Sequence, residues 1–423
     1  MLTRPFAQVP AWRWRGSVRH DLAVVGGGIA GASLAYALAR AGAKVLVLER
    51  ETAFRDRVRG EQLHCWGVAE ARLLGLHELL RAQGGHEVRL WSSRVGGLPS
   101  GSPRDLVDTT PHRLPALNFH HPEMQEVVLQ AAEAAGAEVR RGVVVQGVTP
   151  GQRPLIRVRT PGGANEEFDT RLVVGADGRN SACRGWGGFQ VHREPDRMIV
   201  AGALMHGYGA PTDRITSIMD PAGGRLSFSA PLSRGRCRSY FAWFDVAGSH
   251  GRRRLAGPRS LADFAAGSIA AGAPSEWFAS AELIGPIASF PGADNWVPNP
   301  YRDGMALIGD AAASSDPSFG AGLSLALGDA RSLRDRLLAN EDWEVAAREY
   351  AAEHDGRYGA VRRITGWIRT LFLDPRPEAV ALRARALPRI VADPSRRVDY
   401  VGLGPLAPSD DAARRRLFGE DEG

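Results

Sequence analysis

Three glycines near the start of the chain have the spacing of a turn that binds a dinucleotide. Gly26, Gly28 and Gly31 stand between an apolar run and an alanine-rich run. In such a turn the first glycine permits the bend, the second lets the backbone approach a pyrophosphate, and the third lets the helix pack on the strand. Ile29 and Ala30 would begin that helix and offer backbone amides to the anion. The pattern predicts a nucleotide cofactor.

Glu49 is the next candidate for the cofactor site. It follows the apolar run Val45 to Leu48, where a carboxylate would accept hydrogen bonds from both ribose hydroxyls of a dinucleotide. We assign its neighbour Arg50 to the same site. A glycine-rich structural turn followed by a surface glutamate is the alternative interpretation.

The elements that hold these residues are predicted by hydrophobic periodicity. Residues 21–50 have the pattern of a strand, a helix and a strand. A second helix is expected from about Glu123 to Ala135, and alternating apolar residues follow from Val139 to Val148. We expect a hairpin formed by Leu155 to Arg159 and Glu166 to Thr170, and Leu172 to Val174 should return to the sheet.

The second half of the chain changes character twice. Strand-like runs broken by glycine and proline fill about 195–300, which predicts an antiparallel sheet over the substrate. A buried strand at Met305 to Ile308 and a helix at Leu323 to Asn340 come next. The rest should be helical, with a polar tail after Pro408 that frays and with these prolines as breakers: Pro375, Pro377 and Pro388.

Composition excludes several classes of protein. Lys44 is the only lysine and stands before an apolar strand, so Schiff-base and Walker-type lysine chemistry are not expected. The net charge of +6 is spread along the chain without interleaved aromatic residues, so nucleic-acid binding is not expected either.

The spacing of the cysteines and histidines does not predict a metal site. Cys65, Cys183 and Cys237 have no Cys-x-x-Cys spacing, so we expect no disulfide framework, no metal and a reducing, cytoplasmic setting. No apolar run is long enough to span a bilayer, and residues 1–20 lack the pattern of a signal peptide. Six histidines carry no metal-ligand spacing and are given no catalytic role: His64, His112, His120, His121, His192 and His206.

Two further motifs give the chain a specific resemblance. The run Val174-Gly175-Ala176-Asp177-Gly178-Arg179 resembles the DG motif of flavoprotein monooxygenases, and Arg184 matches the arginine that follows it. Leu307-Ile308-Gly309-Asp310-Ala311 resembles the GD motif of the same family. The resemblance covers residues 21 to about 340 and implies that Asp177, Gly309 and Asp310 contact FAD.

The segment after the GD motif carries the candidate catalytic positions. Residues 317–324 resemble the loop and helix start that meet the flavin ring in this family, so the resemblance implies catalytic roles for Pro317, Gly320 and Gly322. Backbone amides there would stabilise the negative charge of reduced flavin. The sequence departs from the usual Gly-Gln-Gly-x-Asn form at Ala321 and Ser324, so we expect contacts from the backbone of Ala321, Gly322 and Leu323.

The region after Glu49 resembles two branches of the family. Arg59 matches an arginine that reaches the FAD phosphates, and Gln125 occupies the place of a glutamine that contacts the flavin. An exposed arginine and a solvated glutamine are the alternatives. The pattern of Gly60-Glu61-x-Leu63, then Gly67 and then Leu-Gly-Leu also resembles squalene monooxygenases and prenyl reductases, which keeps an alkene substrate possible.

The resemblance implies the para-hydroxybenzoate hydroxylase-like fold. We expect an α/β protein with a Rossmann-type FAD-binding domain, an inserted antiparallel β-sheet substrate domain and a helical C-terminal region. The expected limits are an N-terminal extension at 1–20, the FAD-binding domain at 21–190 and 285–345 with an inserted segment at about 86–118, the substrate domain at 191–284, and the helical region with its polar tail at 346–423.

The resemblance also implies a reaction. NAD(P)H would reduce FAD as a transient electron donor, and molecular oxygen, added to the flavin as a C4a-hydroperoxide, would be transferred to a small organic substrate. The chain carries no second Gly-x-Gly-x-x-Gly, as expected of single-component hydroxylases in this family. Alternatives are an oxygen-independent reductase of prenyl groups and a prenyl-binding escort protein that needs no flavin. A flavin-dependent halogenase is disfavoured, because Lys44 lies in the first strand pair.

Overall fold

The first strand lies in the middle of a parallel sheet. The computed structural model describes residues 20–58, 60–96, 98, 101–245 and 254–421. Within them β1 (Leu22–Val25) pairs in parallel with β12 (Leu172–Gly175) on one side and β2 (Val45–Glu49) on the other. The sheet continues through β2 to β8 (Glu138–Arg141) and through β12 to β22 (Met305–Leu307), and ends with the antiparallel strand β21 (Tyr301–Arg302).

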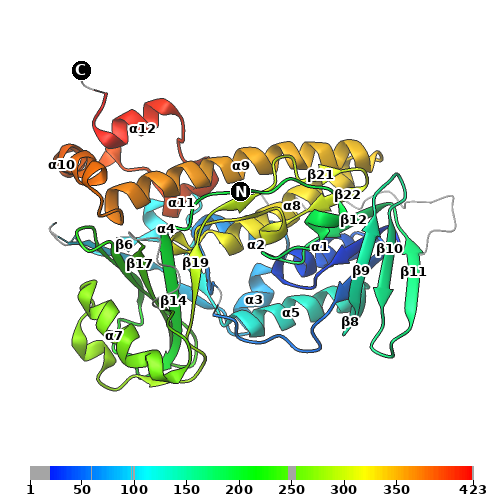
Figure 1. Cartoon of the computed structure of the whole chain (residues 1–423), viewed down its shortest axis with the longest axis horizontal. Helices are drawn as coiled ribbons and strands as arrows, with labels where there is room; N and C mark the ends of the chain where they lie inside the picture. Colours follow the sequence, from blue (N-terminus) through cyan, green and yellow to red (C-terminus); the bar gives the residue numbers. More distant parts are fainter. Residues whose placement is uncertain (1–19, 59, 97, 99–100, 246–253, 422–423) are drawn as a thin grey trace.

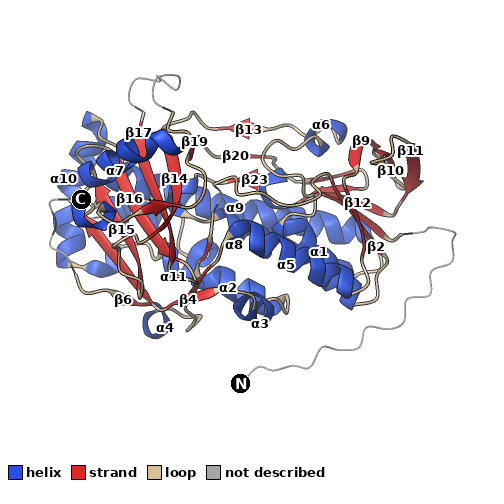
Figure 2. Cartoon of the chain, turned by 90° about the horizontal axis from the view of Figure 1, so that it is seen from below, coloured by secondary structure: helices blue, strands red, loops and turns tan. Residues whose placement is uncertain are grey.

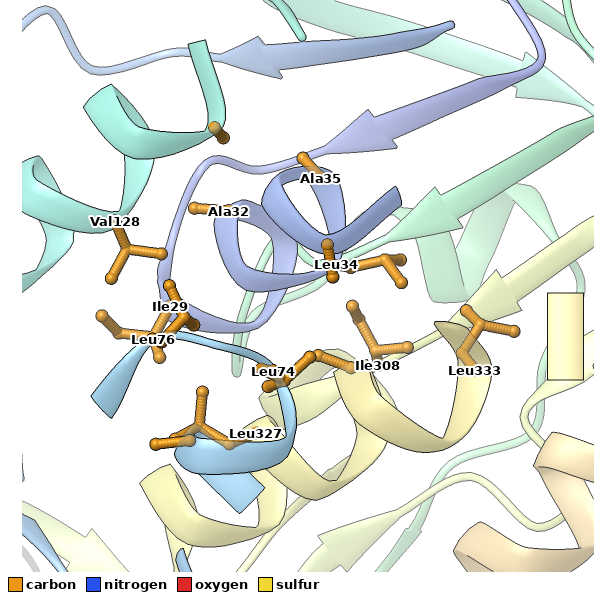
Figure 3. Packing of buried hydrophobic residues seen from close by; sticks show 14 of the residues in the cluster. Ile29, Ala32, Leu34, Ala35, Leu74, Leu76, Val128, Ile308, Leu327 and Leu333 are labelled. Carbon is orange, nitrogen blue, oxygen red and sulfur yellow. The ribbon is translucent and has the colours of Figure 1, made fainter. Parts of the chain in front are cut away.

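Alternate residues of β1 pack into two different cores, as the two-residue period of a strand requires. Leu22 and Val24 face a helical layer, which buries them with residues of α1 (Ile29–Arg40), α5 (His121–Ala134) and α8 (Gly322–Ala339). Ala23 and Val25 face a second sheet. Figure 3 shows Ile29, Ala32 and Ala35 of α1 among side chains of the neighbouring helices. The sheet is therefore covered on both faces.

The second sheet is a three-stranded layer on the other face of β1. It consists of β9 (Val144–Thr149), β10 (Leu155–Arg159) and β11 (Asn165–Asp169), with the expected hairpin between the last two. The run from Val139 to Val148 is divided between β8 and β9 and is not one strand. Gly142 has φ +72 between them, so the chain leaves one sheet and enters the other.

The large antiparallel sheet lies at the opposite end of the molecule from β9, β10 and β11 (Figure 1). Helix α7 (Leu261–Ala270) packs on its outer face, an element that the strand-like pattern did not predict. The segment near 86–105 contributes β5 to this sheet, in parallel with β15. Its strands are β5 (Leu90–Val95), β6 (Arg104–Asp105), β14 (Met198–His206), β15 (Arg214–Asp220), β16 (Arg225–Pro231), β17 (Arg236–Phe244), β18 (Glu282–Leu283) and β19 (Ala288–Gly292).

The C-terminal region begins with the 30-residue helix α9 (Trp343–Phe372), which crosses above α8 toward the large sheet (Figure 1). Two expectations for this region are wrong. Pro388 does not break the chain but lies inside α10 (Pro377–Ala392), where Ala379, Ala386 and Ile390 are buried. The described part of the tail after Pro408 does not fray but forms α12 (Asp411–Phe418), because Leu417 and Phe418 bury against α10. Tertiary packing overrides local propensity at both places.

Shorter elements connect these layers, and Figure 2 shows several of them between the two large sheets. Among the described residues we find no helix with the length and apolar character needed to cross a bilayer. The shorter helices are α2 (Cys65–Leu73), α3 (His77–Ala82), α4 (Leu106–Thr109), α6 (Cys183–Trp186) and α11 (Tyr400–Leu403), with 3-10 turns η1 (Pro258–Ser260), η2 (Ser275–Phe278), η3 (Gly309–Ala311), η4 (Pro317–Phe319), η5 (Pro394–Arg396) and η6 (Gly404–Leu406). The shorter strands are β3 (Gln62–Leu63), β4 (His86–Val88), β7 (Ala116–Asn118), β13 (His192–Arg193), β20 (Asn295–Trp296) and β23 (Ala313–Ser314).

Candidate active site

The glycine turn joins β1 to α1 with two positions that exclude any side chain. Gly26 has φ +106, and a Cβ built there would lie 2.4 Å from the carbonyl oxygen of Ala176. A Cβ at Gly31 would lie 2.1 Å from the carbonyl oxygen of Gly26. Gly28 differs, because its nearest neighbour would be Gln125 Nε2 at 3.7 Å. The protein itself therefore leaves room at Gly28, on the side that faces the cavity described below.

Helix α1 begins at this turn with its amide end open. Gly28 is the N-cap residue, no side chain caps the helix, and its first turn carries no acidic residue. The first amides of a helix have no acceptor within the helix and create a partial positive charge. An anion such as a pyrophosphate would satisfy them.

Glu49 lies beside the turn and is buried. Its Oε2 accepts a hydrogen bond from the amide of Gly27 at 2.7 Å, and its Oε1 accepts one from the amide of Glu51 at 2.8 Å. The carboxylate therefore fixes the backbone on both sides while it lines the cavity. Arg50 is exposed at the rim, and Gln125 of α5 is half-buried opposite Gly28.

Arg184 holds the DG and GD loops together. Its guanidinium donates to the carbonyl oxygens of Ala311 at 2.8 Å, Asp310 at 2.7 Å and Arg179 at 3.0 Å. The side chain is buried. Asp177 Oδ2 accepts from the amides of residues 182 and 183, and its Oδ1 is buried without a hydrogen-bond partner.

The GD loop is also fixed from the helical side. The amide of Gly309 donates to Asp329 Oδ2 at 2.8 Å, and His354 Nδ1 lies 2.9 Å from Asp329 Oδ1. The Tyr350 hydroxyl donates to the carbonyl of Leu307 at 2.7 Å. Helices α8 and α9 thus set the position of Asp310.

Arg184→Met should weaken cofactor binding and destabilise the fold together. Several buried carbonyl oxygens would lose a charged donor, and hydrogen bonds to charged groups contribute about 1.5–3 kcal/mol each. We expect the free energy of unfolding to fall by about 3–5 kcal/mol, in the range seen when a buried charged partner is removed. Urea unfolding with and without added FAD measures both effects. Arg179→Met is the comparison, and an unchanged midpoint for Arg184→Met would contradict the clamp.

The segment before α8 brings a second helix start to the cavity. Gly320 has φ +65 after η4, and α8 begins at Gly322 without a side-chain cap or an acidic residue in its first turn. Gly322 and Leu323 are half-buried at the cavity, whereas the Ala321 side chain is fully buried away from it. Ser324 is buried as well, and its Oγ accepts from the amide of His64 at 3.2 Å. The serine therefore fixes the α2 segment against α8.

A buried ion pair anchors η4 to the C-terminal region. Asp316 caps η4 through the amide of Ser318 at 2.9 Å, and Arg369 of α9 lies 2.9 Å from its Oδ2. Asp294 is buried nearby, accepts from the Tyr358 hydroxyl at 3.0 Å, and has its pKa raised to about 7 by burial and by the neighbouring Asp316. Helix α9 thus helps to position Pro317 and Gly320.

One cavity of about 1740 Å³ joins these parts. Gly31 and Gly309 shape the backbone from outside its lining, as Ala321 does, and Arg59 lies outside the described residues. The structure brings the other predicted site residues together around it: Gly26, Gly28, Ile29, Ala30, Glu49, Arg50, Gln125, Asp177, Asp310, Pro317, Gly320, Gly322 and Leu323.

A cluster of charged residues for which the sequence predicted no role lies at the same cavity. Glu61 and Arg238 are fully buried, with Arg238 Nε 3.0 Å from Glu61 Oε1 and Arg238 Nη2 2.7 Å from Asp56 Oδ2. The Tyr240 hydroxyl donates to Glu61 Oε2. Burial raises the pKa of Glu61 to about 7 despite the arginine, and Arg238 and His120 hold the pKa of Asp56 below its usual range although burial opposes this.

His64 is another residue at the cavity to which the sequence analysis gave no role. It lines the cavity, and its Nε2 lies 2.9 Å from the carbonyl oxygen of Phe319, which also accepts from the Tyr400 hydroxyl at 2.8 Å. Burial lowers the pKa of His64 to about 4, so the ring is neutral and donates from Nε2. Its position after the Gly60-Glu61-x-Leu63 pattern was the available signal.

The residues present fit a bound dinucleotide. Two helix starts without acidic residues, the buried carboxylate of Glu49 and the open side of Gly28 all face the same cavity. The unpartnered Oδ1 of Asp177 offers a further acceptor. Anionic groups are favoured at the two helix starts, while hydroxyl groups suit the carboxylates.

Comparisons with known proteins agree with this geometry. A family described as FAD binding domain matches residues 19–353. The chain is 29% identical to rifampicin monooxygenase of Streptomyces venezuelae over 371 residues, which cover 85% of the chain and 73% of the relative. It is 28% identical to digeranylgeranylglycerophospholipid reductase 1 of Methanopyrus kandleri over 320 residues, 73% of the chain and 77% of the relative. The solved OxyS anhydrotetracycline hydroxylase from Streptomyces rimosus shares the fold, with a TM-score of 0.66 and 24% identity over 89% of this chain and 74% of that one.

Proposed function

The chain belongs to the FAD binding domain family, and from this premise we propose that it is a monooxygenase that hydroxylates or epoxidises a small organic substrate with NAD(P)H and molecular oxygen. The chain is an FAD-dependent oxidoreductase. The observation that carries the proposal is the convergence of two helix starts, those of α1 and α8, on one cavity whose other wall is the large sheet.

The residues described above have separate tasks in holding the cofactor. The amides at the start of α1 would bind the pyrophosphate, and Glu49 would accept hydrogen bonds from the ribose. Asp310 would contact the ribityl and pyrophosphate region of the cofactor. Bound FAD supplies electron transfer and activation of oxygen. The side chains described above would contribute binding and orientation.

The start of α8 would supply the electrostatic part of the reaction. The backbone amides of Ala321, Gly322 and Leu323 and the partial positive charge of the helix would stabilise negative charge that develops on a bound flavin. Gly320 in its left-handed conformation lets the chain turn into the helix there. The sheet strands β14 to β17 would cover the reacting groups and exclude water.

Oxygen incorporation tests the proposal. Purified protein loaded with FAD would be given NADH or NADPH, labelled molecular oxygen and a panel of hydroxylated polycyclic aromatics and isoprenoid alcohols. We expect substrate-dependent NAD(P)H oxidation and one labelled oxygen atom in the product. The likeness to a prenyl-type reductase makes the oxygen-free reaction the decisive control. Product formation at the same rate without oxygen would replace the monooxygenase by a reductase.

A further inference from the structure

The segment between η4 and α8 contains a backbone carbonyl with two side-chain donors. The carbonyl oxygen of Phe319 lies 2.9 Å from His64 Nε2 and accepts from the Tyr400 hydroxyl at 2.8 Å. A carbonyl oxygen has two lone pairs, so both acceptor positions of this one are occupied. The donors come from distant parts of the chain, since His64 precedes α2 and Tyr400 begins α11.

Both side chains are held in the protonation state that donates. His64 is buried and its Nδ1 has no hydrogen-bond partner, so a second proton on the ring would find no acceptor there. Burial lowers the pKa of His64 to about 4, which leaves a neutral ring with its proton on Nε2. Burial also raises the pKa of Tyr400 well above its usual value, and the nearby Asp316 and Asp294 add to this shift. The Phe319 carbonyl therefore has two neutral donors at physiological pH.

The aromatic rings around this carbonyl fix one another. The ring of His64 meets the ring of Tyr400 edge to face, with centroids 5.2 Å apart, and stacks on Trp66 at 5.9 Å. The Phe319 ring meets Tyr400 edge to face at 6.4 Å. Edge-to-face and offset arrangements are the favourable geometries of such pairs. Packing thus sets the direction of both donors.

Tyr400 is held in place from the edge of the large sheet. The preceding residue, Asp399, caps α11 through the amide of Gly402 at 3.0 Å. Its two carboxylate oxygens accept from the two terminal nitrogens of Arg104 of β6, at 2.6 and 2.8 Å. A two-point pair of this kind fixes the orientation of both partners. The C-terminal region therefore holds the turn before α8 through a firmly placed tyrosine.

The acidic residue of this turn is compensated from the same region. Asp316 is fully buried, and Arg369 of α9 lies 2.9 Å from its Oδ2. Helix α8 begins at Gly322, a few residues later. The turn thus contains two negative groups, the Asp316 carboxylate and the Phe319 carbonyl oxygen, and the protein supplies donors to both. The positive end of α8 is not opposed by an uncompensated group beside it.

We propose that Tyr400 and His64 are positioning residues for the flavin, which hold the Phe319 carbonyl so that the chain enters α8 with its amides, and no unpartnered carbonyl oxygen, beside the cofactor cavity. This inference rests on the proposed function, which assigns the start of α8 to the flavin ring. A carbonyl dipole released near that ring would oppose the negative charge that reduction places on it. The two donors therefore make a bound flavin easier to reduce.

The midpoint potential of the FAD-loaded protein tests this role without turnover. Tyr400→Phe removes one donor, His64→Leu removes the other, and His64→Gln replaces the ring donor by an amide donor. Tyr36→Phe is the matched control, because the Tyr36 hydroxyl also donates to a backbone carbonyl, that of Gly75 at 3.3 Å, but lies outside the cavity lining. Potentials would be measured without oxygen against a reference dye, and the urea midpoint of each protein would be recorded beside them.

We expect Tyr400→Phe and His64→Leu each to shift the two-electron reduction equilibrium about fivefold toward oxidised FAD, which lowers the midpoint potential by about 20 mV. The double variant should shift it by more than about 25-fold, because the carbonyl is released only when both donors are gone. His64→Gln should regain at least half of the shift, and Tyr36→Phe should keep the wild-type potential.

Equal potentials in wild type, Tyr400→Phe and the double variant would overturn the inference. A fall in potential that also appears in Tyr36→Phe and follows the urea midpoint would overturn it as well, because general loosening of the fold would then be the cause. If His64→Leu does not fold, Tyr400→Phe and Tyr36→Phe still decide the question. A protein that shows the expected shifts but never incorporates oxygen would refute the monooxygenase proposal and leave the role of Tyr400 and His64 in place.

Discussion

Gly28→Val is expected to give a folded protein that no longer retains FAD. The backbone at Gly28 has φ −67 and ψ −178, which any residue adopts, and a Cβ there contacts nothing closer than 3.7 Å. The side chain would instead fill the space in front of the α1 amides. Losing two charge-assisted hydrogen bonds of about 1.5–3 kcal/mol each corresponds to a 100-fold or greater loss of FAD affinity. Flavin absorbance after gel filtration and titration of the apoprotein with FAD measure this loss.

Two other glycines serve as controls for Gly28→Val. Gly31→Val should destabilise the protein itself, since its side chain would collide with the Gly26 carbonyl and with β1. Gly356→Ala, in α9 with open space around it, should change neither property. A yellow Gly28→Val protein with wild-type affinity would show that the pyrophosphate does not bind at this turn.

The glycine turn and the DG and GD motifs beside the cavity were predictable because their sequence signals are local. The turn at Gly26 to Gly31 is read from a few adjacent positions, and the strands around it are buried on both faces, so they appear as continuous apolar runs. The DG and GD motifs are likewise short. Arg184 was recognised by its place in a motif, although its contacts with the GD loop join residues more than a hundred positions apart.

The cluster of Asp56, Glu61, Arg238 and Tyr240 beside the large sheet could not be predicted in the same way. Glu61 and Tyr240 are 179 positions apart, and the register of β17 against β14 and β16 decides which of its side chains face the cavity. A single sequence with several polar residues in each strand does not reveal that register. The C-terminal helices were underestimated for a related reason, because Leu417 and Phe418 are buried only through their contacts with α10.

Among changes to the cluster of Asp56, Glu61 and Tyr240, Arg238→Met should cause the largest loss of stability. It would leave Asp56 and Glu61 buried without their cation, and removing one partner of a buried ion pair costs about 3–5 kcal/mol. The loss should depend on pH. In the wild type the pKa of Glu61 is raised to about 7, so burial of this group already opposes folding increasingly as the pH rises from about 4.5 through 7. Without Arg238 the folded-state pKa of Glu61 rises further, and the destabilisation grows toward alkaline pH.

Asp56 adds a second pH dependence, because its pKa in the folded state is lowered whereas that of Glu61 is raised. Its pKa is held low by Arg238 and His120, so its favourable contribution is present above its unfolded pKa and is lost in acid. Removing Arg238 removes part of that contribution, so the variant and the wild type should converge below about pH 4 and separate further above neutrality. Urea unfolding between pH 3 and 9 would show this convergence. The double variant Glu61→Gln with Arg238→Met should regain part of the lost free energy, since it removes one uncompensated charge. A destabilisation that is constant over the whole pH range would mean that Arg238 stabilises the fold by packing. Compensation of the charge of Glu61 would then not be the role of the arginine.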